Sequence, residues 1–222
     1  MTSREFCERV TRRARRVGVH LVDGLIERLE AYYRLLEAWN SKINLTALDL
    51  AAGNDSTIDR LLIEPLVAAR HIERDASVID IGSGGGSPAI PLNIARLDLR
   101  FTLVEAKTRK SAFLREAGRQ LDLPLRVETS RYEALLTRPE LHEAFDVGTM
   151  RAVRVEGRVL LGLQAFLKPG GELLLFRGGS GAEVPSVLAP PLFWSATHTL
   201  LESERSRLVV LRKALVGPQA AL

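Results

Sequence analysis

The sequence predicts an α/β fold, with a seven-stranded, mostly parallel, doubly wound sheet of the Rossmann-like kind. Three observations support this. From residue 77 onward, short apolar runs alternate with stretches of helical periodicity, which is the pattern of βαβ units. The first of these runs, 77–81, leads into a glycine-rich turn. Two late runs, 196–201 and 207–211, are separated by only five residues, which allows an antiparallel C-terminal hairpin but no parallel crossover.

Helices are expected before the sheet, over 1–17 and 22–41. Apolar residues of the second helix recur at spacings of three and four and form one face: Leu25, Leu29, Tyr32 and Leu36. A further helix is expected from Ser56 or Thr57, as N-cap, to Arg70, with a kink or a second start at Pro65.

In the sheet region the expected strands and helices alternate. The strands are expected at 77–81, 100–104, 125–128, 145–149 and 171–176. The helices are expected near 88–95, 108–121, 131–137 and 155–167. The segment 168–171, Lys-Pro-Gly-Gly, is expected to end the last helix and to turn into the fifth strand. We therefore divide the chain into an N-terminal helical cap, 1–75, and one compact sheet domain, 76–222.

The turn after the first strand carries glycine at alternate positions, Gly82, Gly84 and Gly86, and follows Asp80. Glycine lets a ligand approach the backbone closely and adopts dihedral angles that other residues avoid. The next strand ends on a second carboxylate, Glu105, which suits a ribose diol. Together these features predict a nucleoside-cofactor site at the carboxyl edge of the sheet.

The glycine spacing discriminates between cofactors. A dinucleotide fingerprint has the spacing G-x-G-x-x-G, and its third glycine position is Ser87 here, followed by Pro88. The observed G-x-G-x-G after an aspartate resembles the first motif of class I S-adenosylmethionine-dependent methyltransferases, whose cofactor has no pyrophosphate to seat. A nicotinamide cofactor and a glycine-rich turn without a ligand stay open as alternatives.

Composition narrows the class of protein. No apolar run approaches the length of a membrane span, so we expect a cytoplasmic protein that does not contact the membrane. The single Cys7 and four scattered histidines offer no metal-ligand spacing, and we expect no metal. The net charge is +4, and six arginines lie in the first twenty residues: Arg4, Arg9, Arg12, Arg13, Arg15 and Arg16. This basic N-terminal face suits contact with phosphates or is simply a solvated helix face.

Several motifs are distributed along the chain: Trp39-Asn40 followed by Ile43-Asn44-Leu45-Thr46, then 80–88, Ile90-Pro91-Leu92, Lys107–Arg115, Ser130–Glu133 and Arg151-Ala152. They resemble those of one family, the bacterial 16S rRNA guanine-N7 methyltransferases RsmG, also called glucose-inhibited division protein B. The element from Trp39 to Thr46 is the most specific of them, and the resemblance covers roughly residues 20–213. The resemblance implies S-adenosylmethionine as cofactor and 16S rRNA or the small ribosomal subunit as partner, and we expect a monomer.

The resemblance also implies roles for individual residues. The backbone at Gly82 and Ser87 would pack against the methionine part of the cofactor, and Glu105 would accept both ribose hydroxyls. Tyr132 and Glu133 would flank the adenine. Arg151, just past the fourth strand, is the predicted catalytic residue and joins Asp80, Gly84 and Gly86 among the predicted cofactor-binding residues; it would bind the acceptor base or a phosphate. Alternatively, Arg151 is a surface cation or forms a salt bridge to Asp146. Weaker RNA-binding candidates are Arg131 and Arg177. Asp80 is expected to cap the glycine turn through backbone amides, and Trp39 to pack in the core rather than stack on RNA.

The chain departs from the family pattern at several positions. Gly85 and Ser87 stand where the glycine loop of the family has a proline and a bulky residue. Leu61, Glu64 and Pro65 replace a histidine and an aspartate-serine pair, and Arg177 replaces a lysine. These changes bear on the RNA site and the target nucleotide.

The predicted chemistry needs no acid–base pair, because guanine N7 has a free lone pair. Proximity and orientation would then supply most of the rate, roughly 7–11 kcal/mol. A single cysteine in a basic helix does not fit a thiolate mechanism. Two other functions remain open: a methyltransferase that acts on a small molecule or protein, and a non-catalytic RNA-binding assembly factor on the same fold.

Overall fold

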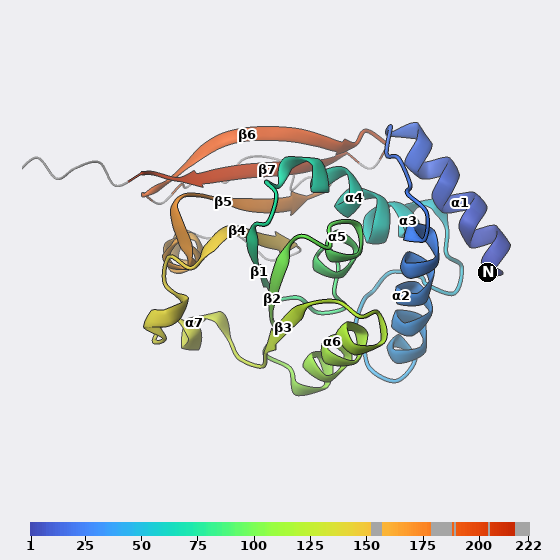
Figure 1. Ribbon diagram of the computed structural model, residues 1–222, viewed down its shortest axis with the longest axis horizontal. Coiled ribbons are helices and arrows are strands. Elements are labelled where there is room, and N and C mark those ends of the chain that lie inside the picture. Colours follow the sequence, from blue (N-terminus) through green and yellow to red (C-terminus); the bar gives the residue numbers. More distant parts are fainter. Residues whose placement is uncertain (152–156, 179–187, 189, 204, 216–222) are drawn as a thin grey trace, which may run out of the picture.

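The computed structural model describes residues 1–151, 157–178, 188, 190–203 and 205–215. Its centre is a seven-stranded sheet in the order β3-β2-β1-β4-β5-β7-β6 (Figure 1). The strands are β1 (Ser77–Ile81), β2 (Arg100–Val104), β3 (Leu125–Glu128), β4 (Phe145–Arg151), β5 (Leu167–Arg177), β6 (Leu192–Leu201) and β7 (Ser206–Lys213). The first five are parallel, and β6 and β7 form the predicted hairpin. Only β7 runs against the others, because it is antiparallel to both β5 and β6. The predicted fold class is confirmed.

Helices cover both faces of the sheet, and the alternation of side chains along each strand explains why (Figure 1). On β5, Leu174 and Phe176 join one core cluster, whereas Leu173 and Leu175 join the other. The first cluster is covered by α4 (Glu64–Ala68), α5 (Ala89–Ala95) and α6 (Thr108–Gln120). The second is covered by α7 (Tyr132–Leu135) and α8 (Gly157–Leu163). Residues 155 and 156 of the expected 155–167 helix lie outside the described residues.

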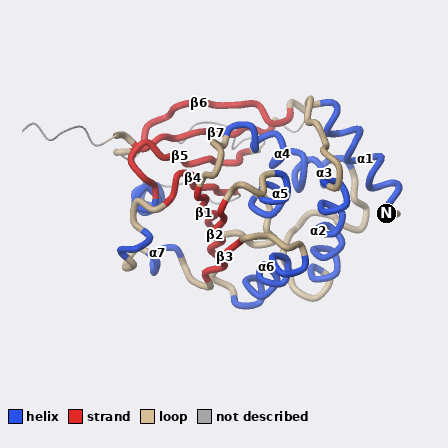
Figure 2. Tube along the Cα trace, viewed as in Figure 1, coloured by secondary structure: helices blue, strands red, loops and turns tan. Residues whose placement is uncertain are grey.

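The N-terminal helices form an outer layer (Figure 2): α2 (Leu25–Asn40) packs against α5 and α6, and α1 (Ser3–Arg16) packs against α2 and the helical segment before β1. The predicted apolar face of α2 is buried, at Leu25, Leu29, Tyr32 and Leu36. These side chains belong to the same core cluster as one face of the sheet. The division of the chain at residue 75 therefore stays a prediction about sequence organisation, since the hydrophobic core is continuous across it.

The segment before β1 is helical, with changes of pitch along its length. It begins at α3 (Asp55–Ile58), continues through a π-helical turn (Asp59–Ile63) into α4 and ends in a 3-10 turn (Ala69–His71). The expected N-cap at Ser56 or Thr57 is wrong: the Asn54 side chain caps the helix by accepting from the Thr57 N–H at 2.8 Å. Pro65 lies in the first turn of α4, which confirms the predicted second start, because proline needs no N–H partner there.

The expected turn at 168–171 is also wrong, since these residues lie inside β5. The pairing register with β4 shifts between Phe145 and Val147, and the two glycines lie in the resulting bulge of β5. Gly170 has a positive φ of 79°. A Cβ at Gly171 would lie 2.9 Å from the Lys168 carbonyl oxygen. The Pro-Gly-Gly run therefore bends a strand, whereas the preceding helix has already ended at Phe166.

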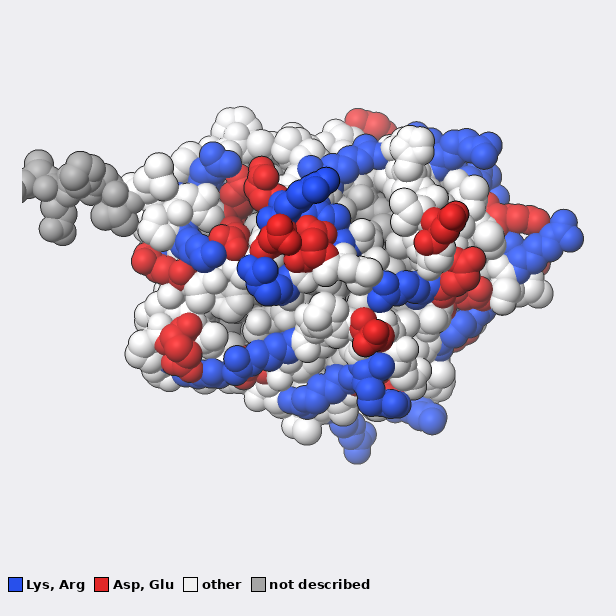
Figure 3. All heavy atoms as spheres, viewed as in Figure 1, with Lys and Arg blue, Asp and Glu red and all other residues white. Residues whose placement is uncertain are grey.

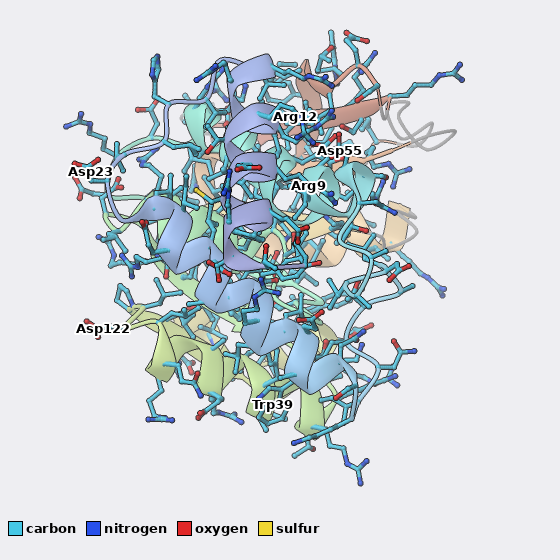
Figure 4. All side chains as sticks on the ribbon, turned by 90° about the vertical axis from the view of Figure 1, so that its right-hand side faces the viewer. Arg9, Arg12, Asp23, Trp39, Asp55 and Asp122 are labelled. Atoms are coloured by element: carbon cyan, nitrogen blue, oxygen red, sulfur yellow. The ribbon has the colours of Figure 1, made fainter. Side chains whose placement is uncertain are left out.

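Half of the N-terminal arginines are used inside the fold. Arg9 and Arg12 of α1 point toward Asp55 of α3 (Figure 4), and the Arg12 Nη2 to Asp55 Oδ1 distance is 2.8 Å. Arg13 is buried and donates from Nε to Asp59 Oδ1 at 2.7 Å. These pairs dock α1 on the helical segment before β1. Much of the basic sequence at the N-terminus thus serves tertiary packing, while Arg15 and Arg16 are exposed.

Candidate functional site

The glycine turn leaves β1 at the carboxyl edge of the sheet. Its three alternate glycines all have positive φ, 75° at Gly82, 51° at Gly84 and 88° at Gly86, a region that L side chains avoid. Gly86 is also sterically required, because a Cβ there would lie 2.4 Å from the Ile90 Cδ1 atom. The local sequence therefore fixes a tight turn that opens into α5, with Gly82 exposed at its mouth.

Glu105, at the end of β2, holds this turn in place. Its Oε2 accepts from the Gly84 N–H at 3.0 Å, and its Oε1 accepts from the Lys107 N–H at 2.8 Å. The expectation that Asp80 caps the turn through backbone amides is wrong. Asp80 is buried, and its Oδ1 accepts from the Thr149 hydroxyl at 2.6 Å, which links β1 to β4. Burial raises the pKa of Asp80 to about 6.

A cavity of about 690 Å³ lies beside the turn, between the strand ends and helices α7 and α8. This volume falls in the range of roughly 300–1,000 Å³ that is usual for small-molecule and cofactor sites. The predicted site residues that line it are Gly82, Glu105, Arg131, Tyr132 and Glu133. Its remaining wall is largely apolar, with Ile81, Val104, Leu136, Met150 and Val159. An apolar cleft with one carboxylate at a strand end is suited to a nucleoside.

A second cavity, of about 460 Å³, lies on the other side of the turn and shares Gly82 with the first. Gly84, Ser87 and Arg151 line this cavity rather than the first, so the predicted site residues fall on both sides of the turn. Gly86 is buried. Among the lining residues that the sequence did not assign to a site are Thr46, Arg60 and Lys110. Thr46 and Lys110 lie in motifs noted in the sequence, 43–46 and 107–115. Membership in these motifs was the only feature of the sequence that could have pointed to them as site residues.

Arg151 of the second cavity is held by two polar partners. It lies at the end of β4, where its Nη1 forms a salt bridge with Glu64 Oε2 at 2.8 Å and donates to the Arg60 carbonyl oxygen at 2.7 Å. Its guanidinium carbon lies 4.7 Å from the centre of the Phe176 ring. Burial lowers the pKa of Arg151 and raises that of Glu64.

The alternative pairing of Arg151 with Asp146 is wrong, since Asp146 binds Lys168 and Ser77 at the opposite end of β4. Arg177 ends β5 opposite Arg207 of β7 and is half-buried.

The Trp-Asn and Asn-Leu-Thr element builds the outer wall of the second cavity. The Asn40 Oδ1 accepts from the backbone N–H groups of Leu45 at 2.8 Å and Thr46 at 3.0 Å. Trp39 of α2 lies near α6 (Figure 4). It packs edge-on against Phe113 of α6, with ring centres 5.8 Å apart, which confirms the core-packing prediction. The most specific motif of the sequence therefore shapes a loop and anchors it to the sheet domain.

Charge on the molecule is unevenly spread. On the face shown in Figure 3, Lys and Arg side chains gather over α6, whose Arg109, Arg115 and Arg119 are exposed. Within the described part of the chain, no cluster of three or more His, Cys, Asp or Glu side chains could hold a metal ion. Among those same residues, no helix has the length and apolarity to cross a membrane.

The parallel sheet and the glycine turn at its carboxyl edge give the chain the class I methyltransferase fold. A SAM-dependent methyltransferase from Aquifex aeolicus superposes with a TM-score of 0.55 at 12% identity, over 72% of this chain and 95% of that one. The [4+2]-cyclase SpnF superposes with a TM-score of 0.57 at 16% identity, over 84% and 94%. Because a cyclase shares the architecture, these likenesses establish the fold alone.

The chain belongs to the rRNA small subunit methyltransferase G family (GidB), whose profile matches residues 25–183. A ribosomal RNA small subunit methyltransferase G from Neisseria meningitidis is 36% identical over 71% of this chain and 70% of its own length. One from Xanthomonas oryzae pv. oryzae is 37% identical over 82% and 84%. The family predicted from the sequence motifs is confirmed.

Proposed function

We propose that this protein transfers a methyl group from S-adenosylmethionine to N7 of one guanine in small-subunit ribosomal RNA. The family and the names of its relatives support the RNA substrate. The guanine N7 position follows from the sequence resemblance and from chemistry that the site can perform. An enzyme with this substrate acts where ribosomes are, which agrees with the predicted cytoplasmic location, and we retain the predicted monomer.

The residues of the larger cavity fit the cofactor. Glu105 is only 8% exposed, yet it lines the cavity, and each of its oxygens retains a lone pair beyond the backbone bonds to Gly84 and Lys107. It can therefore accept the ribose hydroxyls while it holds the turn. Tyr132 and the apolar side chains would enclose the adenine. When bound, S-adenosylmethionine supplies an electrophilic methyl group on a sulfonium centre.

One observation carries the proposal: Gly82 lines both cavities. A group transferred between two ligands must pass where their sites adjoin, and Gly82 has no side chain that would lie between them. The guanine N7 lone pair would attack the methyl carbon, so that the N–C bond forms as the C–S bond breaks. No proton leaves, so the site needs orientation rather than a general base.

The second cavity is suited to a base from RNA. Arg60, Lys110 and Arg151 place three cationic side chains on its wall, and Leu36, Leu45 and Leu48 provide apolar surface. The exposed cations of α6, the helix that supplies Lys110 to this cavity, would contact the phosphate backbone of the RNA. A base must leave its stack to reach such a pocket, which favours a single accessible nucleotide.

The test is transfer of labelled methyl from S-adenosylmethionine to small ribosomal subunits and to their naked RNA, both isolated from cells that lack this modification. Nucleoside analysis should give one 7-methylguanosine peak, absent with large-subunit RNA and with the Glu105→Ala variant. A different labelled nucleoside would refute the N7 assignment. Cofactor binding without any RNA labelling would refute the RNA substrate and favour a small-molecule or protein acceptor.

A further inference from the structure

A buried carboxylate holds the guanidinium at the acceptor cavity. Glu64 of α4 is 2% exposed, and its Oε2 lies 2.8 Å from Arg151 Nη1. The two side chains come from segments 87 positions apart in the chain. The same Nη1 donates to the Arg60 carbonyl oxygen, and Phe176 lies against the guanidinium plane. Arg151 is therefore fixed from the helical segment before the sheet and from β5.

Stability alone does not account for this pair. Removing two charges from water costs about as much as their attraction returns, so an apolar pair of equal volume is often as stable or more so. The pair also leaves polar atoms unused: Glu64 Oε1 and Arg151 Nε and Nη2 are buried and have no hydrogen-bond partner among the described residues. Because the guanidinium is planar, fixing Nη1 also sets the direction of the other donors.

Charge gives the carboxylate a second role. Transfer to N7 moves a positive charge from the sulfonium to the base, and a lone guanidinium beside that base would repel it. A carboxylate in contact with the guanidinium offsets its charge where screening by water is weak. Asp80 is the other acidic group that acts on Arg151, and Arg60 adds a further positive charge.

We propose that Glu64 is a positioning residue for methyl transfer, which orients the Arg151 guanidinium toward the acceptor base and offsets its charge. This inference rests on the proposed function, since it assumes that the second cavity receives the base. It assigns a role to a position at which the chain departs from the family pattern: glutamate, one methylene longer, in place of aspartate.

A double-mutant cycle tests the inference. Glu64→Gln and Arg151→Met are measured singly and together for kcat and KM with small-subunit RNA, for cofactor Kd by calorimetry and for thermal unfolding. We expect Glu64→Gln to lower kcat at least tenfold while cofactor Kd stays within twofold. We expect the double variant to lose no more turnover than Arg151→Met alone, because Glu64 acts through that residue.

Asp59→Asn is the matched control, because Asp59 also lies in the helical segment before the sheet and pairs with a buried arginine, Arg13, and neither of these side chains lines the two cavities. It should lower stability without changing kcat. If Glu64→Gln fails to fold, Glu64→Asp, which keeps the charge, replaces it and should retain more turnover than the double variant. Unchanged kcat in the Glu64 variant, or losses that multiply in the double variant, would overturn the inference. A wild-type protein that binds cofactor but labels no RNA would instead overturn the proposed function, and the inference with it.

Discussion

Replacing Tyr32 by phenylalanine tests whether the N-terminal cap sets the shape of the cofactor loop. Tyr32 is fully buried on α2, and its hydroxyl donates to the Gly85 carbonyl oxygen at 2.7 Å. It is a direct polar link between the cap and the glycine turn. Tyr33 is an internal control in the next position, since it is equally buried but donates to the Leu50 carbonyl, away from the turn.

The magnitude follows from the loss of one hydrogen bond. A net contribution of about 1 kcal/mol should lower Tm by roughly 2–4 °C in a protein of this size, for Tyr32→Phe and Tyr33→Phe alike. If the bond orders the turn for the cofactor, Tyr32→Phe should also raise the Kd for S-adenosylmethionine up to about fivefold, because 1.4 kcal/mol corresponds to tenfold. Tyr33→Phe should leave that Kd unchanged.

The assays are differential scanning calorimetry for Tm and isothermal titration for Kd, both on the full chain. Equal cofactor affinity of the two variants, with equal losses of Tm, would refute the idea that the cap acts on the turn. A loss of affinity in both would show that the effect passes through global stability rather than through Gly85.

Three further predictions concern single side chains. Burial raises the pKa of Asp80 in the folded state above its unfolded value, to about 6. Protonated Asp80 therefore stabilises the folded state, and this contribution is lost as pH rises through that value. At neutral pH the free energy of unfolding is lower by about 3 kcal/mol, at 1.36 kcal/mol per pKa unit. Urea titrations should therefore show Asp80→Asn gaining stability relative to wild type between pH 4.5 and 7.5, and a constant difference would contradict this. Glu105→Ala should raise the cofactor Kd at least about tenfold by calorimetry, since it removes an acceptor of charge-assisted hydrogen bonds; an unchanged Kd would remove Glu105 from the ribose site. Asp59→Asn should lower the free energy of unfolding by about 1.5–3 kcal/mol, because it weakens charge-assisted hydrogen bonds to buried Arg13, whose Nη1 still lies 3.4 Å from Asp55 Oδ2; a loss below about 1 kcal/mol would argue against that pairing.

Local patterns predicted most of the architecture correctly. The first three strands lie where the apolar runs placed them, and the face of α2 is buried as its periodicity indicated. The turn around Gly82 and the carboxylate of Glu105 do meet at the carboxyl edge of the sheet. These features depend on short-range periodicity and on the geometry of parallel strands, which neighbouring residues determine.

Two errors arose where a residue has a choice of distant partners. Spacing along the chain could not decide whether Asp80 or Glu105 caps the glycine turn, or that Arg151 pairs with Glu64 rather than with Asp146. The Pro-Gly-Gly run at 168–171 signals a turn by itself, but in the structure it bulges within β5, between Leu167 and Glu172, the residues that pair with β4.

By itself, the sequence determined the sheet, the glycine turn and the family, because each is encoded in contiguous motifs. Only the tertiary structure decided how the site is assembled around Gly82. The cavity on its far side needs the 45–48 loop, Lys110 of α6 and Arg151 of β4 together, and the Glu64–Arg151 pair exists only because α4 packs over the end of β4. The physical reason is that charge pairing and cavity shape depend on distances in space, which the packing of helices on the sheet sets and which spacing along the chain does not reveal.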